Sequence, residues 1–167
     1  MVLIGFMGTG KSVIGRRLAA ATGRRFVDTD RQVEHRAGKS VAAIFRDDGE
    51  ARFREMESAV VEAFAGCDGC VIATGGGMAL RPDQIKKLGG IRVALTAPPE
   101  VILERTQRRR QARPLLSGEA PSDKIHRLLA ERAPYYQMAD LSIDTSQMSV
   151  DETVRLIQTR IDALEAG

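Results

Sequence analysis

Short apolar runs alternate with longer amphipathic stretches along the chain, and this alternation predicts the fold class. The runs with the length and composition of buried strands are residues 2–4, 25–27, 70–73, 91–95 and 141–143. Between the first two runs, residues 12–21 carry apolar side chains at helical spacing and are followed by Gly23, which suits the position after a helix. Further helix starts are expected at Pro82, Pro98 and Ser122. The pattern indicates an α/β fold around a parallel sheet.

The order of the predicted elements also locates the functional loops. Right-handed crossovers place helices on both faces of a parallel sheet and gather ligand-binding loops at the carboxyl ends of the strands. With 167 residues, the chain has the length of one domain with one core, so we expect a single domain over residues 1–167. Residues 108–122 mix charge, Pro, Gly and Ser without periodicity, and we expect them to form a mobile loop.

Composition and charge narrow the classes of partner. The net charge is +3 and the pI is about 9.1, which favours an anionic ligand. Aromatic residues make up only 4%, and no stacking or groove-reading motif is present, so we expect no nucleic-acid partner. No stretch approaches the roughly 20 apolar residues of a membrane helix, and residues 1–5 are too short for the core of a signal peptide. We therefore expect a cytoplasmic protein without a membrane partner.

The two cysteines do not form a metal-binding pattern. Cys67 and Cys70 stand in a Cys-Asp-Gly-Cys run with no second pair and no matching pair of histidines, so a zinc site is not predicted. We interpret them as two thiols that are buried or lie in a turn between a helix and a strand.

Residues 5–12 (GFMGTGKS) match the phosphate-binding pattern G-x-x-x-x-G-K-[ST] between a strand and a helix. Glycines let the backbone curl so that its N–H groups face phosphates, and the helix that begins near Lys11 adds its positive dipole end. Lys11 is expected to reach the β and γ phosphates, and Ser12 to supply a hydroxyl to Mg²⁺. The expected ATP-binding residues here are Gly8, Thr9, Gly10, Lys11, Ser12 and Val13. The alternative, a chance glycine-rich turn, does not account for the flanking strand and helix.

Two carboxylates follow the second predicted strand, in the sequence FVDTD. Asp28 is the candidate for holding Mg²⁺ through water together with Ser12, because the third strand ends without an acid. Asp30 can orient a substrate hydroxyl and take its proton as the phosphoryl group is transferred. The alternative for Asp30 is a structural role as the N-cap of the next helix.

Three further features carry candidate ligands for a small anion. Gly75, Gly76 and Gly77 follow the third strand and permit close backbone approach to a ligand, although a flexible turn is the alternative. Arg54 has Glu50 and Glu57 at helical spacing, so ordinary ion pairs explain it equally well. Arg132 has no carboxylate among its helical neighbours, so either its partner comes from elsewhere or it is a solvated arginine.

Arginines are concentrated in and beside the predicted mobile loop. Arg113 stands before Pro114, and the rigid proline can aim its guanidinium at a transferring phosphoryl group when the loop closes. A solvated basic face is the alternative for these arginines.

Six segments, in this order and spacing, resemble the shikimate kinase family over nearly the whole chain: GFMGTGKS, FVDTD, DGEARFRE, ATGGGM, RPLL and ERAPYY. The phosphate loop occurs in many nucleotide enzymes, but the combination is specific. The resemblance implies a three-layer P-loop fold of the nucleoside monophosphate kinase type, with a five-stranded parallel sheet and a closing lid at about 108–121. It also implies ATP-dependent phosphorylation of the 3-hydroxyl of shikimate, with Mg²⁺ as the cofactor.

The same resemblance implies a role for each candidate residue. Asp30 would hold the substrate hydroxyls, and the backbone of the triple glycine, Gly76 above all, would contact the ring hydroxyls. The residues implied to bind the substrate carboxylate are Arg54 and Arg132. The residues implied to clamp the phosphates are Lys11 and Arg113. Arg105 would lie against the adenine, with Arg108 as the alternative.

Two rival functions remain open from the sequence. A sugar-acid kinase such as gluconate kinase shares the phosphate loop and also needs arginines for a carboxylate. A nucleotide-binding module without turnover would use ATP only to set its conformation, but Asp30 and Arg113 argue for catalysis. The favoured hypothesis is a monomeric kinase whose partners are ATP and shikimate.

Overall fold

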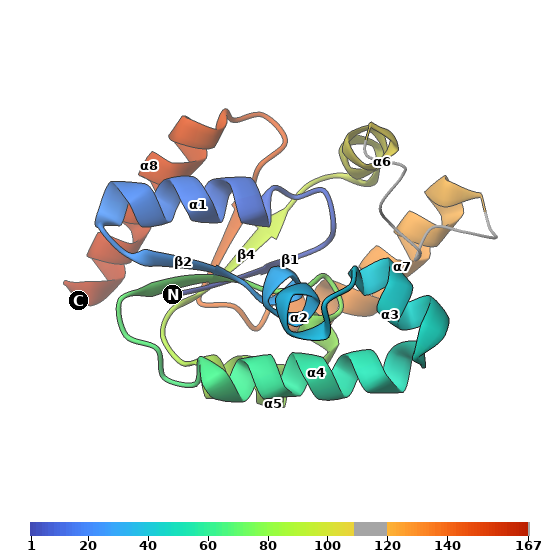
Figure 1. Cartoon of the computed structure of the whole chain (residues 1–167). Helices are drawn as coiled ribbons and strands as arrows, with labels where there is room; N and C mark the ends of the chain where they lie inside the picture. Colours follow the sequence, from blue (N-terminus) through green and yellow to red (C-terminus); the bar gives the residue numbers. More distant parts are fainter. Residues whose placement is uncertain (109–119, 167) are drawn as a thin grey trace.

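Five parallel strands form one central sheet in the computed structural model, which describes residues 1–108 and 120–166 (Figure 1). Their order across the sheet is β2 (Arg25–Asp28), β3 (Cys70–Ala73), β1 (Val2–Gly5), β4 (Arg92–Thr96) and β5 (Leu141–Asp144). All four neighbouring pairs are parallel. The predicted α/β class is therefore confirmed, and each predicted strand agrees with the observed one to within one residue at either end.

The central strands are buried on both faces, which explains their short, continuous apolar sequences. Side chains alternate along β1: Val2 and Ile4 belong to the core on one face of the sheet, and Leu3 belongs to the core on the other. All three are at most 2% exposed.

Helices cover both faces of the sheet and complete the three layers (Figure 1). One face carries α1 (Lys11–Thr22) and α8 (Val150–Glu165), which pack against each other. The helices that contribute to the core on the other face are α2 (Thr29–Ala37), α3 (Val41–Asp47), α4 (Gly49–Ala63), α5 (Pro82–Leu88), α6 (Pro99–Gln107) and α7 (Pro121–Tyr136). A 3-10 turn, η1 (Met78–Leu80), connects residues 75–77, called the glycine loop below, to α5. No helix in the described ranges is long and apolar enough to cross a membrane.

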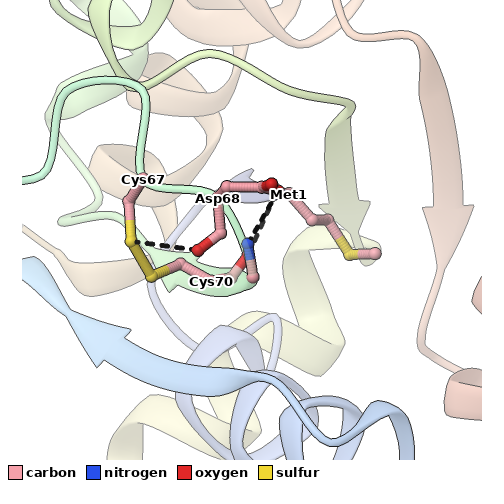
Figure 2. Close-up of a disulfide and its surroundings, with 5 residues drawn as sticks. Met1, Cys67, Asp68 and Cys70 are labelled. Carbon is pink, nitrogen blue, oxygen red and sulfur yellow. Dashed lines mark hydrogen bonds between the residues drawn. A yellow bond between two sulfur atoms is a disulfide. The ribbon is translucent and has the colours of Figure 1, made fainter.

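The interpretation of the cysteines as two thiols is wrong, because Cys67 and Cys70 form a disulfide (Figure 2). Gly66 and Gly69 adopt positive φ angles of 61° and 67°, and the chain turns so tightly that the two cysteine Cα atoms lie 5.9 Å apart. This separation is in the range that a disulfide bridges. The amino group of Met1 donates a hydrogen bond to the Cys70 carbonyl at 3.0 Å. The disulfide thus marks the amino end of β3, the end opposite the glycine loop.

Candidate functional site

A cavity of about 710 Å³ opens where the carboxyl ends of the strands meet. Its lining comes from the phosphate loop, from the segments after β2, β3 and β5, and from α6. The candidates from the sequence that line it are Gly8, Thr9, Gly10, Lys11, Ser12, Val13, Asp28, Asp30, Gly76 and Arg105. The structure therefore brings the phosphate loop, the acidic pair and the glycine loop to one place.

The phosphate loop curls between β1 and α1. Gly8 and Gly10 have φ angles of 82° and 97°, in the left-handed region that favours glycine, and Gly10 is the residue before the first turn of α1. Lys11 is nearly buried, and its Nζ donates to the carbonyls of Gly5 at 2.7 Å and Phe6 at 2.9 Å. The loop thus combines a helix N-terminus with a lysine ammonium group, which is the chemistry of a polyphosphate site.

Ser12 and Asp28 form a pair of oxygen donors beside the phosphate loop. The Ser12 hydroxyl donates to Asp28 Oδ2 at 2.7 Å. Among the described residues, no three His, Cys, Asp or Glu side chains cluster as a ready-made metal site. A hydroxyl and a single carboxylate nevertheless fit Mg²⁺, which binds few protein ligands and completes its octahedron with phosphate oxygens and water.

The two acids at the carboxyl end of β2, Asp28 and Asp30, have different structural roles from those weighed in the sequence. Asp28 is the N-cap of α2 and accepts a hydrogen bond from the Arg31 N–H at 3.3 Å, so the capping role considered for Asp30 belongs to Asp28. Asp30 lies in the first turn of α2, and its Oδ1 is buried without a hydrogen-bond partner in the described part of the chain. Burial, the negative charges of Asp28 and Glu57 and a smaller effect of Glu34 raise the pKa of Asp30 to about 6, although Lys11 opposes them.

A carboxyl group with this pKa is ionised near neutral pH and yet basic enough to accept a proton. Asp30 lines the cavity, so the hydroxyl of a ligand held there can approach its carboxylate. Asp30 can therefore hold and deprotonate an alcohol at the cavity.

The glycine loop packs closely against the residues that the sequence proposed for the acceptor. A Cβ atom on Gly75 would lie 2.5 Å from Asp30 Oδ1 and 3.2 Å from Glu57 Oε1. A Cβ atom on Gly77 would lie 2.6 Å from Arg54 Nη2. Gly76 lines the cavity, and its Cβ would meet nothing closer than 3.6 Å. A side chain at Gly75 or Gly77 would therefore displace the Asp30 carboxylate or the Arg54 guanidinium, while Gly76 is open toward the cavity.

Arg54 makes both of the helical ion pairs that the sequence suggested. Its Nη1 lies 2.9 Å from Glu57 Oε2, and its Nη2 lies 3.2 Å from Glu50 Oε1. The short distance between Nη2 and a Cβ atom placed on Gly77 shows that the same guanidinium also faces the glycine loop. Structural pairing and a ligand-binding position are therefore compatible for this residue.

Arg132 is buried, at 4% exposure, which excludes the solvated alternative. Its Nη1 donates to the Gly76 carbonyl at 2.9 Å, and its guanidinium lies 5.0 Å from the centre of the Phe6 ring. No acid pairs with it among the described residues, and its Nε has no hydrogen-bond partner there. A buried guanidinium that lacks a carboxylate is suited to bind one from a ligand.

Arg105 forms part of the cavity wall next to the phosphate loop. Its Nη2 donates to the Thr145 carbonyl at 2.8 Å, and its Nη1 donates to the Thr145 hydroxyl at 3.0 Å and to the Gly8 carbonyl at 3.3 Å. Arg108 also lines the cavity and pairs with Glu104. Both arginines therefore remain candidates for contact with a base. Arg113 and most of the predicted lid at 108–121 lie outside the described residues.

Sequence reasoning treated Glu57 only as a partner of Arg54, but it is central to this side of the site. Its side chain is fully buried and lies between the guanidiniums of Arg54 and Arg81. The signal was its helical spacing: Glu57 lies four residues after Phe53 and three before Val60, both buried, so it falls on the apolar face of α4. An acid on that face needs partners that are distant in sequence, and the sequence did not identify Arg81 as one.

Comparisons with known proteins agree with one another. The family model described as shikimate kinase matches residues 7–162. A shikimate kinase from Pelotomaculum thermopropionicum is 46% identical over 159 residues, which cover 94% of this chain and 92% of that protein. The solved structure of a shikimate kinase from Acinetobacter baumannii in complex with shikimate is 36% identical, with a TM-score of 0.93 over 99% of this chain and 94% of that one.

The gluconate kinase alternative finds much weaker support. A gluconokinase structure from Sinorhizobium meliloti 1021 has a TM-score of 0.53 and 20% identity, over 92% of this chain and 86% of that one. This likeness shows a shared fold alone.

Proposed function

We infer that this chain, which belongs to the shikimate kinase family, transfers the γ-phosphoryl group of ATP to the 3-hydroxyl of shikimate with Mg²⁺ as cofactor. The observation that carries this proposal is the meeting of two unlike half-sites at one cavity. The phosphate loop lies on one side, and Asp30 and the arginine-flanked glycine loop lie on the other. A phosphoryl donor and an acceptor that carries both a hydroxyl group and a carboxylate can be held there next to each other.

The residues of the phosphate loop bind and neutralise the donor. The helix N-terminus at Gly10 and the ammonium group of Lys11 attract the β and γ phosphates, because both present positive charge inside a curled backbone. Ser12 and Asp28 would hold the metal ion. When bound, Mg²⁺ supplies charge neutralisation at the phosphate oxygens.

The acceptor hydroxyl is the proposed partner of Asp30. Asp30 lines the cavity, and its carboxylate can accept a hydrogen bond from the alcohol. With a pKa of about 6, the Asp30 carboxylate is ionised above that pH and can take the hydroxyl proton as the new P–O bond forms.

Arg54 and Arg132 are the proposed ligands of the acceptor carboxylate. They come from different helices and reach the glycine loop at Gly77 and Gly76. Two guanidiniums can bind a carboxylate bidentately and so fix the orientation of the ring relative to Asp30. Arg105 is proposed to contact the adenine, and Arg113, outside the described residues, to clamp the transferring phosphoryl group.

An assay of ADP release tests the proposal directly. Purified protein is mixed with Mg-ATP and either shikimate, gluconate or no acceptor, and ADP is measured through a coupled reaction. We expect shikimate alone to accelerate ADP release. Faster release with gluconate than with shikimate would support the sugar-acid kinase, and Mg-ATP binding without turnover on either acceptor would support the non-catalytic module.

A further inference from the structure

Arg81 lies outside the cavity, but its contacts converge on the proposed carboxylate pocket. It follows η1 and precedes α5, four residues after Gly77. Its guanidinium reaches α4, where Nη1 donates to Glu57 Oε2 at 3.1 Å and Nη2 donates to the Ser58 hydroxyl at 2.7 Å. Only 25% of the side chain is exposed. Arg81 therefore joins the segment after the glycine loop to the helix that carries Arg54.

Glu57 has two guanidinium partners on a single oxygen. Its Oε2 accepts from Arg54 Nη1 at 2.9 Å and from Arg81 Nη1 at 3.1 Å, and the side chain is fully buried. Electrostatic interactions are stronger in such a poorly hydrated place than at the surface. One arginine facing this acid would form a neutral pair. Two arginines leave an excess of positive charge beside the glycine loop.

The other acid near Arg54 does not cancel this excess to the same degree. Glu50 is 65% exposed, and it meets Arg54 at 3.2 Å. An exposed pair at helical spacing is weak and screened by salt, and a ligand carboxylate can replace it at little cost. The charge balance at the buried end of Arg54 is therefore set by Glu57 and Arg81.

We propose that Arg81 is a positioning residue. By sharing Glu57, it leaves the positive charge of Arg54 only partly neutralised, so that Arg54 can bind the carboxylate of the acceptor. This inference rests on the proposed function, which assigns the acceptor carboxylate to Arg54. Arg81 Nη1 also donates to the Arg54 backbone carbonyl at 3.2 Å, and the Ser58 hydroxyl donates to the same carbonyl at 2.9 Å. The charge that Arg81 supplies is thus held next to the helical turn that orients Arg54.

The test separates charge from mechanical support by using two ligands. Shikimate and its methyl ester share the ring hydroxyls, but only the acid carries a negative charge. Calorimetry gives the Kd of both ligands for the wild type, for Arg81→Met and for Arg81→Lys. We expect Arg81→Met to weaken binding of the acid about tenfold and to leave the ester unchanged, because the lost interaction is with charge. Arg81→Lys keeps the charge and should bind the acid within about threefold of the wild type.

Arg92→Met is the matched control. Arg92 is 30% exposed and pairs with Asp140 at 2.7 Å, but it begins β4, at the opposite end of the strands from the cavity. This variant should bind both ligands like the wild type. The melting temperature of each variant, compared with that of the wild type, shows whether the substitution destabilises the fold.

The outcomes are distinct. A wild type that binds acid and ester equally well would overturn the proposed function, and this inference with it. A wild type that prefers the acid, together with an Arg81→Met variant that keeps the preference or loses both ligands in parallel, would overturn the inference alone. If Arg81→Met does not fold, Arg81→Lys decides: loss of the acid preference in a folded Arg81→Lys variant would contradict the role of charge.

Discussion

The two sides of the cavity are built in different ways. The phosphate side is formed largely by consecutive residues, 5–12, whose backbone curls around a helix N-terminus and a single lysine. The acceptor side is assembled from side chains that are far apart in sequence: Asp30 on α2, Arg54 on α4 and Arg132 on α7, around the glycine loop. Local sequence therefore specifies the first side, and tertiary packing specifies the second.

The difference has energetic consequences. The backbone of the phosphate loop is held in place by β1 and α1 on either side, so few side-chain substitutions can change its conformation. On the acceptor side, buried charges depend on one another, because Glu57 is shared by two arginines and, after burial and Asp28, contributes to the raised pKa of Asp30. A substitution there is expected to affect its neighbours, while a substitution on the phosphate side should act mainly on the donor and reach the acceptor side through the charge of Lys11, which lowers the pKa of Asp30.

The largest expected effect comes from the phosphate side. Lys11→Met removes the ammonium group that is proposed to neutralise the β and γ phosphates, and we expect kcat to fall about 10³-fold or more. The shikimate Kd, measured by calorimetry without nucleotide, should change far less than kcat, because Lys11 is not a proposed ligand of shikimate and reaches the acceptor side through its charge near Asp30. Lys87→Met, on a surface lysine paired with Glu62, is the control. Comparable loss of kcat in both variants would show that the effect is not specific to the phosphates.

The next effect is expected on the acceptor side. Arg132→Met keeps the volume of a buried side chain but removes the guanidinium that bonds the Gly76 carbonyl. We expect the KM for shikimate to rise about 10²-fold while the KM for ATP changes little, since the lost partner is the acceptor carboxylate. Steady-state kinetics with each substrate varied in turn give the two values. Equal increases in both KM values would point to a folding defect and not to a lost ligand.

The contrast between the two sides also explains how much the sequence could predict. The strands, the three-layer fold and the phosphate loop followed from local patterns, because apolar runs, glycine positions and helix starts are properties of neighbouring residues. The fold prediction is confirmed by the sheet and by the shikimate kinase structures it matches.

The acceptor side could be predicted only in part. Sequence reasoning found Arg54, Arg132 and the glycines, but it could not distinguish structural from ligand-binding arginines, because burial and long-range partners depend on the fold. It named Glu57 only as a partner of Arg54, and it missed the second arginine on that acid, Arg81, which is 24 residues away from Glu57 in the sequence. It also missed the Cys67–Cys70 disulfide, because a short Cys-x-x-Cys spacing allows a bond but does not require one.

A smaller effect is expected from the packing of the glycine loop. Gly77 has a φ of −85°, which alanine can adopt, so Gly77→Ala tests the contact alone: its Cβ would lie 2.6 Å from Arg54 Nη2. Arg54 must shift, and we expect the KM for shikimate to rise about tenfold. At Gly76 the nearest protein atom would be 3.6 Å away, so Gly76→Ala should leave Arg54 in place, and any rise in KM would come from the methyl group entering the cavity that Gly76 lines. An unchanged KM for shikimate in Gly77→Ala would contradict this account of the loop.

The smallest expected effect concerns stability. Burial and neighbouring charges raise the pKa of Asp30 to about 6 in the folded protein, whereas an unfolded aspartate has a pKa near 4. Between these values the folded state binds the additional proton, so this residue makes the free energy of unfolding decrease as pH rises from about 4 to 6, and the decrease persists above pH 6.

Asp30→Asn removes that charge, and we expect it to raise the free energy of unfolding at pH 7.5 by about 1 kcal/mol. At pH 4 the variant and the wild type should differ by much less, because the folded wild type is then protonated at this position. Urea unfolding at both pH values gives the comparison. A variant that is less stable than the wild type at pH 7.5 would mean that the Asp30 carboxylate is stabilised by its surroundings, which would contradict the raised pKa that suits Asp30 to accept the hydroxyl proton.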